Sequence, residues 1–313
     1  MDKSFLGSEF EYISQRTFAS AGAISNKTFF VACLKGDVDE VKKLHLKSVE
    51  NGIGFLKVDP NHVFIIDGEQ ETALSVAIKT KNLPIFEYII VEMKDLLVFD
   101  NPTNFISYLH IIAKSSLPDE KTDEFVQKAL GLLAKHLPTI DVNVQDKDGF
   151  TPLHTACLCG NYSMIVGLIE NFPACDLGKE NYHGNTPLEI LVDNPWVTRT
   201  MNCMLALMYL LASRRMTTKI LNHVTIRGNS ALTISDGPFT VTLLEKRTDW
   251  DPRLIAKKAE LVNIRSCKDF KSEDKAPLDK VNPVAQTLGW GSIFFYSPFG
   301  MFFDFVWLKY WAK

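Results

Sequence analysis

The segment DKDGFTPLHTAC at residues 146–157 decides the fold. Its glycine permits a tight turn with positive φ, and Thr151-Pro152 favours a helix start because threonine caps a helix and proline suits the first turn. Leu153 and Ala156 then share one face of a short helix. A second helix supplies a wider apolar face: Met164, Ile165, Leu168 and Ile169. The segment therefore predicts a turn followed by two short helices as one unit.

This segment resembles the ankyrin repeat, whose marker is T-P-L-H-x-A within a period of about 33 residues. A second copy follows in tandem as GNTPL at residues 184–188. With Thr151 as reference, copies begin at Lys27, Thr72, Ser107, Thr151, Thr186 and Ser230, separated by 45, 35, 44, 35 and 44 residues. The alternation indicates a unit of about 33 to 35 residues in which every second copy carries an insertion of about ten.

The resemblance implies an all-α fold, an ankyrin-repeat solenoid of about six helix-turn-helix units with loop insertions and a divergent C-terminal cap or tail. Stacking is required because one repeat cannot bury its apolar face alone. We expect an N-terminal capping segment at 1–25, the array at 26–235, the divergent cap at 236–270, a charged linker at 271–282 and an aromatic hydrophobic tail at 283–313.

The insertions suggest local structure. Residues 54–60 and 62–67 have the β-branched and aromatic content of a hairpin. Residues 115–122 lengthen the connection before an expected helix at 123–136, and residues 193–198 do so before one at 201–215. Beyond the last copy, residues 238–244 look strand-like or irregular, and Asp251-Pro252 opens a helix through about Ile264.

The tail carries no charge from Val281 to Phe303 and is rich in aromatic residues, among them Trp290, Phe294, Phe295, Phe299, Phe302, Trp307 and Trp311. Its glycines and Pro298 argue against one clean transmembrane helix. Two interpretations stay open. The tail lies in a membrane interface, or it covers the last helices or meets a partner as a hydrophobic surface.

The bulk composition limits the classes of function. With 46% apolar residues, 23% charged residues and a net charge of −3, the chain folds and has no global attraction to nucleic acid. Its six cysteines, several within apolar stretches, indicate reduced thiols, and the first residues lack a secretory signal pattern. We therefore expect a cytoplasmic protein, with no signal for a homo-oligomer.

Catalytic and metal motifs are missing from the sequence. There is no phosphate loop, no H-E-x-x-H and no G-x-S-x-G, and Cys157-Leu158-Cys159 lacks the second pair that a zinc site uses. His110 and His154 occupy the marker histidine position, where the resemblance implies hydrogen bonds from one turn to the next. We therefore expect no enzyme, no cofactor and no metal site.

The resemblance implies a protein partner bound on the concave face, by turn tips and the exposed ends of the first helices. The residues at these positions are Glu69, Glu71, Lys79, Thr80, Lys147, Asp148, Phe150, Leu158, Cys159, Tyr182, His183, Asn185, Asp193, Arg227 and Asn229. Phe150 beside Tyr182 and His183 suggests a hot spot, although packing of Phe150 on its neighbouring turn explains that residue equally well.

An adaptor that binds a protein is thus the first functional hypothesis. The alternatives are a scaffold tethered to a membrane by the aromatic tail and an enzyme with a site in the divergent region at 236–313. The divergent repeats and aromatic tail are also similar to ankyrin effectors that intracellular bacteria deliver into host cells, which would place the protein in a host cell acting on a host protein.

Overall fold

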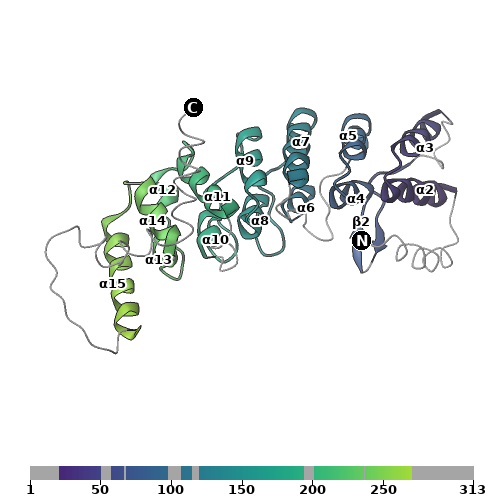
Figure 1. Ribbon diagram of the computed structural model, residues 1–313. Coiled ribbons are helices and arrows are strands. Elements are labelled where there is room, and N and C mark those ends of the chain that lie inside the picture. The colour runs from purple at the N-terminus through teal and green to yellow at the C-terminus, as the bar shows by residue number, and fades with distance from the viewer. Residues whose placement is uncertain are drawn as a thin grey trace. The chain divides into compact units, whose positions relative to one another are not determined.

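The computed structural model describes residues 21–50, 58–66, 68–97, 107–114, 120–193, 201–235 and 237–269. Across these residues the chain is mostly helical (Figure 1). It divides into two compact units, one ending at Met216 and the other beginning at Thr217. The expected linker at 271–282 and the aromatic tail at 283–313, with its Trp and Phe residues, lie outside the described residues, as do residues 1–20 of the expected capping segment.

The first unit consists of helices in two layers. Their bounds are α2 (Ala21–Lys35), α3 (Val38–Glu50), α4 (Ala73–Lys79), α5 (Leu83–Glu92), α6 (Tyr108–Lys114), α7 (Glu120–His136), α8 (Pro152–Cys159), α9 (Tyr162–Asn171), α10 (Pro187–Asp193) and α11 (Met201–Ala212), with a 3-10 turn η1 (Lys94–Leu96). Helices α2, α4, α6, α8 and α10 pack each on the next in one layer. Helices α3, α5, α7, α9 and α11 do the same in the second (Figure 1).

The starts of the first-layer helices follow the capping chemistry expected from the sequence. Thr151 caps α8 by accepting the His154 backbone N–H, and Pro152 occupies the first turn. Thr72 caps α4 in the same way through Ser75. The copy assigned at Lys27 is different, because α2 begins at Ala21 and runs through that position without a helix start there.

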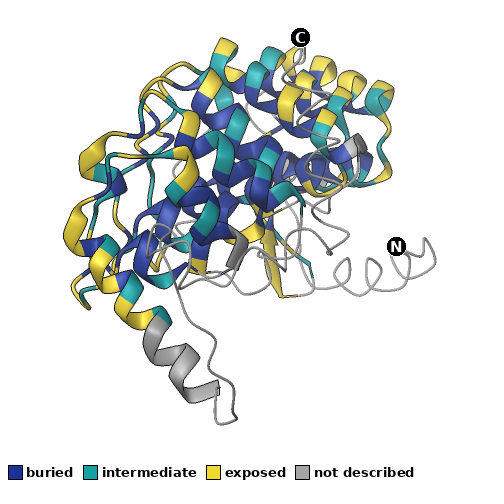
Figure 2. Ribbon diagram, turned by 60° about the vertical axis from the view of Figure 1, so that its left-hand side comes forward, coloured by how far each residue is buried: buried dark blue, intermediate teal, exposed yellow. Residues whose placement is uncertain are grey.

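Packing between the layers buries the expected apolar positions. Leu153 and Ala156 of α8 and Leu168 of α9 are buried. In Figure 2 the buried positions, in dark blue, lie along the sides of the helices that face one another, while exposed positions follow the turns and outer faces. The second layer approaches closely at Gly167 of α9, where a Cβ would lie 2.4 Å from Leu130 Cδ1 of α7.

Two helical glycines give a matched test of this packing. Gly131→Ala should raise the free energy of unfolding by about 0.5–1 kcal/mol, since a Cβ there meets nothing within 4 Å and alanine favours the helix. Gly167→Ala should lower it by about 1–2 kcal/mol, because overpacking against Leu130 outweighs the gain in propensity. Urea unfolding of both variants measures whether the two free energies of unfolding change in opposite directions. A more stable Gly167→Ala variant would contradict the close contact between Gly167 and Leu130.

Hydrogen bonds from Arg215, which follows α11, link this part of the chain to α9. Arg215 donates hydrogen bonds to the carbonyl oxygens of Ile169 at 3.1 Å and Phe172 at 3.3 Å, and also to that of Cys175. The guanidinium therefore satisfies carbonyl groups at and beyond the end of α9, where a positive charge also suits the helix dipole.

Arg215→Ala should lower the free energy of unfolding by about 2 kcal/mol, because several carbonyl groups lose a charged donor together. Arg214, which is exposed, is the control, and its alanine variant should change stability by less than about 0.5 kcal/mol. Thermal and urea unfolding of the two variants make the comparison. Equal effects would show that the Arg215 hydrogen bonds do not stabilise the unit.

The described residues contain one hairpin, which was not predicted with these two strands. β1 (Phe64–Ile66) is antiparallel to β2 (Glu69–Glu71), with Ile65 opposite Gln70. Of the first predicted strand, residues 58–60 form no strand and residues 54–57 lie outside the described residues, so its pairing with 62–67 stays a prediction; the second predicted strand contains β1. The missed signal is the dipeptide Asp67-Gly68, a typical two-residue hairpin turn, and Gly68 has a φ of +80°.

The second unit contains α12 (Thr218–Leu221), α13 (Ala231–Ile234), α14 (Gly237–Lys246) and α15 (Pro252–Asp269). The strand-like or irregular assignment of residues 238–244 is wrong, since they belong to α14. Phe239 and Leu243, four residues apart, are both buried, so helical packing overrides the β-branched composition. α15 also continues past Ile264 to Asp269.

Two helices of the first unit have bounds that differ from the expectation. α7 begins at Glu120, inside the segment expected to be a connection, and α11 ends at Ala212 before the expected Arg215. Arg215 is used instead as the donor to the end of α9.

Candidate partner-binding surface

Two successive turns before α8 and α10 have the same hydrogen-bond pattern. In the first, the Asp146 backbone N–H donates to Phe150 O at 2.9 Å, and Asp146 Oδ1 accepts the Phe150 N–H at 2.8 Å. In the second, Asn181 makes the same pair of bonds to Asn185, at 2.9 and 3.0 Å. Each turn has a glycine at positive φ, with values of +78° for Gly149 and +75° for Gly184. The side chain that begins each turn therefore closes it.

The two turns contact each other directly. The Tyr182 backbone N–H donates to Asp148 O at 3.3 Å. A Cβ on Gly149 would lie 2.7 Å from atoms of the Tyr182 ring, so the ring lies against the glycine backbone. Tyr182 is nevertheless 67% exposed. The tip thus presents an aromatic side chain whose position is restricted by the preceding turn.

The other tip residues divide into exposed and packed groups. Lys147, Asp148 and His183 are exposed, and Asn185 is half-buried. Phe150 is also half-buried and packs edge-on against the His154 ring, with centroids 5.7 Å apart at 69°. The structure therefore favours packing over the hot-spot interpretation for Phe150.

The marker histidines link one turn to the next, as the resemblance implied. His154 Nδ1 accepts the Thr151 backbone N–H at 3.2 Å, so its Nε2–H donates to Asn185 O at 3.0 Å. His110 donates likewise to Phe150 O at 2.8 Å. Burial lowers the pKa of both rings, to about 4 for His154. Both side chains are neutral structural donors at neutral pH.

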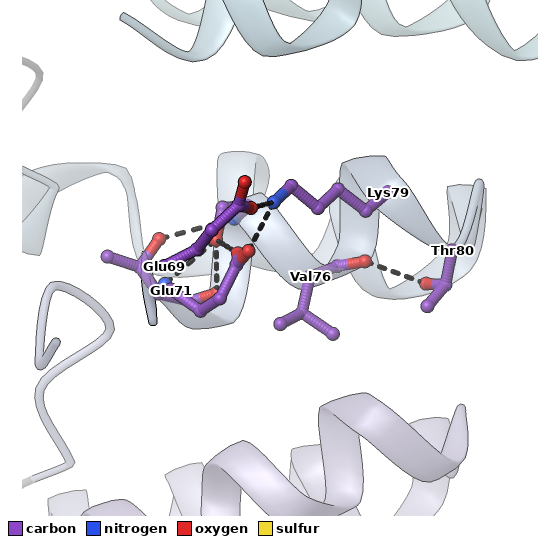
Figure 3. Close-up of polar contacts among 7 residues, drawn as sticks. Glu69, Glu71, Val76, Lys79 and Thr80 are labelled. Atoms are coloured by element: carbon purple, nitrogen blue, oxygen red, sulfur yellow. Dashed lines mark hydrogen bonds and ion pairs between the residues drawn. The ribbon is translucent and has the colours of Figure 1, made fainter. Parts of the chain in front are cut away.

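The ends of the first-layer helices form a row of equivalent positions. Lys79, Lys114, Leu158 and Asp193 are separated by 35, 44 and 35 residues, which are the copy spacings, and all four are exposed. Thr80 and Cys159 occupy the next position in their copies and are also exposed. The Thr80 hydroxyl donates to Val76 O at 2.8 Å (Figure 3).

One cluster of expected binding residues is engaged internally. Lys79 Nζ forms ion pairs with Glu69, at 2.6 Å, and with Glu71 (Figure 3). Glu71 is only 6% exposed and also accepts a hydrogen bond from the Ser75 hydroxyl. The structure thus gives Glu71 the role of fastening β2 to α4, whereas Glu69 and Lys79 remain exposed.

In the second unit, the turn at residues 225–229 repeats the pattern with threonine. The Thr225 backbone N–H donates to Asn229 O at 2.7 Å, and its hydroxyl accepts the Asn229 N–H at 3.1 Å. Arg227 and Asn229 are exposed, as expected. Ile226 is 91% exposed and was missed, although its place after Thr225 corresponds to that of Tyr182 after Asn181.

Cys157 lies in the core of the first unit. Complete burial raises the pKa of Cys157 well above its usual value, so its thiol is a core group.

Within the described ranges, no group of three or more His, Cys, Asp or Glu side chains could hold a metal ion. Over the same ranges, no helix combines the length and apolar character needed to cross a membrane.

A family model of ankyrin repeats matches residues 133–191, which span the end of α7 through most of α10. Residues 133–191 are therefore ankyrin repeats. The matched segment contains both turns and the two histidine links described above. Ankyrin repeats are typically interaction modules without catalytic activity, which agrees with the buried, neutral state of His154.

The chain is also similar to curated proteins over a short stretch. It is 41% identical over 69 residues to the human SMC5-SMC6 complex localization factor protein 1, covering 22% of this chain and 6% of that protein. The bovine counterpart is 38% identical over 63 residues, which are 20% of this chain and 6% of the relative. The mouse counterpart is 44% identical over 52 residues, or 17% and 5%. The matches thus cover about a twentieth of the relatives' length.

Proposed function

We propose that this protein is an adaptor that binds another protein through the tip surface, defined as Lys147, Asp148, Tyr182 and His183, together with the helix-end positions Lys114, Leu158, Cys159 and Asp193. The observation that carries the proposal is Tyr182, which is largely exposed and yet held against Gly149. Aromatic side chains in fixed positions dominate the energetics of protein interfaces.

The wider arrangement supports the same function. We infer that the chain holds about six ankyrin units, and that within the first unit each first-layer helix adds one position to a continuous binding surface. Relatives that share a short stretch with this chain are named for localising a protein complex, which favours a partner that is itself part of an assembly. The buried free thiols of Cys33, Cys157, Cys175 and Cys203 favour a reducing compartment such as the cytoplasm.

Affinity capture with the full chain, followed by mass spectrometry, tests the proposal. Tyr182→Ala combined with His183→Ala should reduce recovery of the specific partner at least tenfold, as expected for loss of a hot-spot aromatic residue. Leu46→Ala, on α3, is the control because Leu46 is also an exposed apolar residue but lies outside the tip surface. Partner recovery that falls equally with the control, or with neither variant, would count against the tip surface.

A further inference from the structure

The β-hairpin of the first unit has an apolar outer strand. Val63 directly precedes β1 and is 41% exposed, and Ile65, the central residue of β1, is 65% exposed. Residues 62–66 contain no Asp, Glu, Lys, Arg or Pro. Edge strands usually carry charged residues or proline, because these prevent pairing with another chain. β1 therefore lacks the usual protection of an edge strand.

The backbone of Ile65 is also open to a further strand. Ile66 is opposite Glu69 and closes the two-residue turn, so this pair exchanges hydrogen bonds. Such pairs alternate along an antiparallel ladder with pairs that exchange none, and Ile65 opposite Gln70 is of the second kind. The N–H and C=O of Ile65 thus point away from β2. Across the residues that the structure describes, neither group has a hydrogen-bond partner.

The hairpin is held at its base by side chains of both strands. The ring of Phe64, on the opposite face of β1 from Ile65, lies 4.3 Å from the ring of Phe30 on α2, measured between centroids. Glu71 of β2 is joined to α4 by its ion pair with Lys79. Figure 1 shows the hairpin extending beyond α4. The free edge of β1 is therefore presented in a fixed position to an incoming strand.

The edge of β1 is complementary to a second copy of itself. When two copies of β1 pair antiparallel about a two-fold axis at Ile65, each Ile65 backbone offers its N–H and C=O to the other. Phe64 of one copy then lies opposite Ile66 of the other, and the two exposed Ile65 side chains lie side by side. Like charges do not meet, because residues 62–66 contain no Asp, Glu, Lys or Arg.

We propose that β1 is the contact strand of a homodimer, in which two copies of the chain join their hairpins into one sheet with both β1 strands at its centre. This goes beyond the adaptor function and uses a surface separate from Tyr182. Each copy contributes one short strand, so the buried area is at the low end for protein interfaces and the dimer exchanges with monomers. The dimer presents two partner-binding surfaces, which raises the avidity for a partner that is itself repeated.

Sedimentation equilibrium of the full chain tests the proposal. The weight-average mass of the wild type should rise toward that of a dimer between about 5 and 500 µM, a range that suits a small, exchanging interface. Ile65→Lys and Ile65→Glu should each weaken dimerisation at least about tenfold, because the two-fold axis places like charges directly opposite each other. An equimolar mixture of the two variants should recover the association, since opposite charges then face each other.

The matched control is Ile226→Lys, which changes an isoleucine of the second unit that is 91% exposed. This variant and Tyr182→Ala should associate like the wild type. A wild type that stays monomeric over the whole range would overturn the proposal and leave the edge to a strand of a different protein. Association that survives both Ile65 variants, that their mixture does not restore, or that falls equally with Ile226→Lys would also overturn it, because the contact would then not be centred on Ile65.

Discussion

Replacing Gly149 with alanine is expected to lower the free energy of unfolding by about 3 kcal/mol. Gly149 has a φ of +78°, where an L side chain is strained by about 1–2 kcal/mol. In addition, the new Cβ would lie 2.5 Å from the Tyr182 backbone nitrogen. Because backbone cannot swing aside like a flexible side chain, the two turns must separate.

Gly68→Ala separates the two contributions. Gly68 has a φ of +80°, but a Cβ there meets nothing within 4 Å, so its variant should lose only the conformational part, about 1–2 kcal/mol. Urea unfolding followed by circular dichroism measures both. Equal losses of unfolding free energy for Gly149→Ala and Gly68→Ala would show that the close approach of the two turns adds nothing to the effect of the Gly149 substitution.

Acidification from pH 7 toward pH 4 is expected to destabilise the first unit by about 3 kcal/mol through His154 alone. The pKa of His154 is about 4 in the folded protein and 6.5 in the absence of structure. Between these values the unfolded chain binds a proton that the folded chain does not, so stability is fully present above pH 6.5 and is lost as the pH falls toward 4. The pKa of His110 is also lowered, mainly by burial, and adds to the loss.

The pH dependence of urea unfolding between pH 7.5 and 4.5 tests this expectation. His154→Asn should be less stable than the wild type at pH 7.5, because it loses the link to Asn185, and should show a smaller loss on acidification. His183→Asn, at the exposed tip, is the matched control. A wild-type stability that stays constant from pH 6.5 to 4.5 would contradict the buried neutral state of His154.

Much of the first unit could be predicted because its signals are local. Thr151-Pro152 specifies a helix start within three residues, and Gly149 specifies the turn before it, so both features follow from a short segment. The marker histidines could be placed for the same reason, since their partners recur at fixed offsets in successive turns.

Other features depend on contacts that a local pattern does not contain. The composition of residues 238–244 is that of a strand, and only the burial of Phe239 and Leu243 on one side explains α14. Glu71 occupies a position that was expected to be exposed. Its ion pair with Lys79, eight residues away, instead connects the hairpin to α4. In the candidate site, the positions of the turn tips could be predicted from the sequence. The difference in exposure between Tyr182, which is exposed, and Phe150, which is half-buried, could not.

The Tyr182 ring lying against Gly149 has a consequence for the thermodynamics of association. Ordering a mobile side chain at an interface costs about 0.5–1.5 kcal/mol. Tyr182 has already given up part of that freedom during folding, because the preceding turn restricts its ring while leaving it exposed. The tip is therefore partly preorganised, so a partner that binds there would have less conformational entropy to remove from Tyr182 than from a freely mobile side chain.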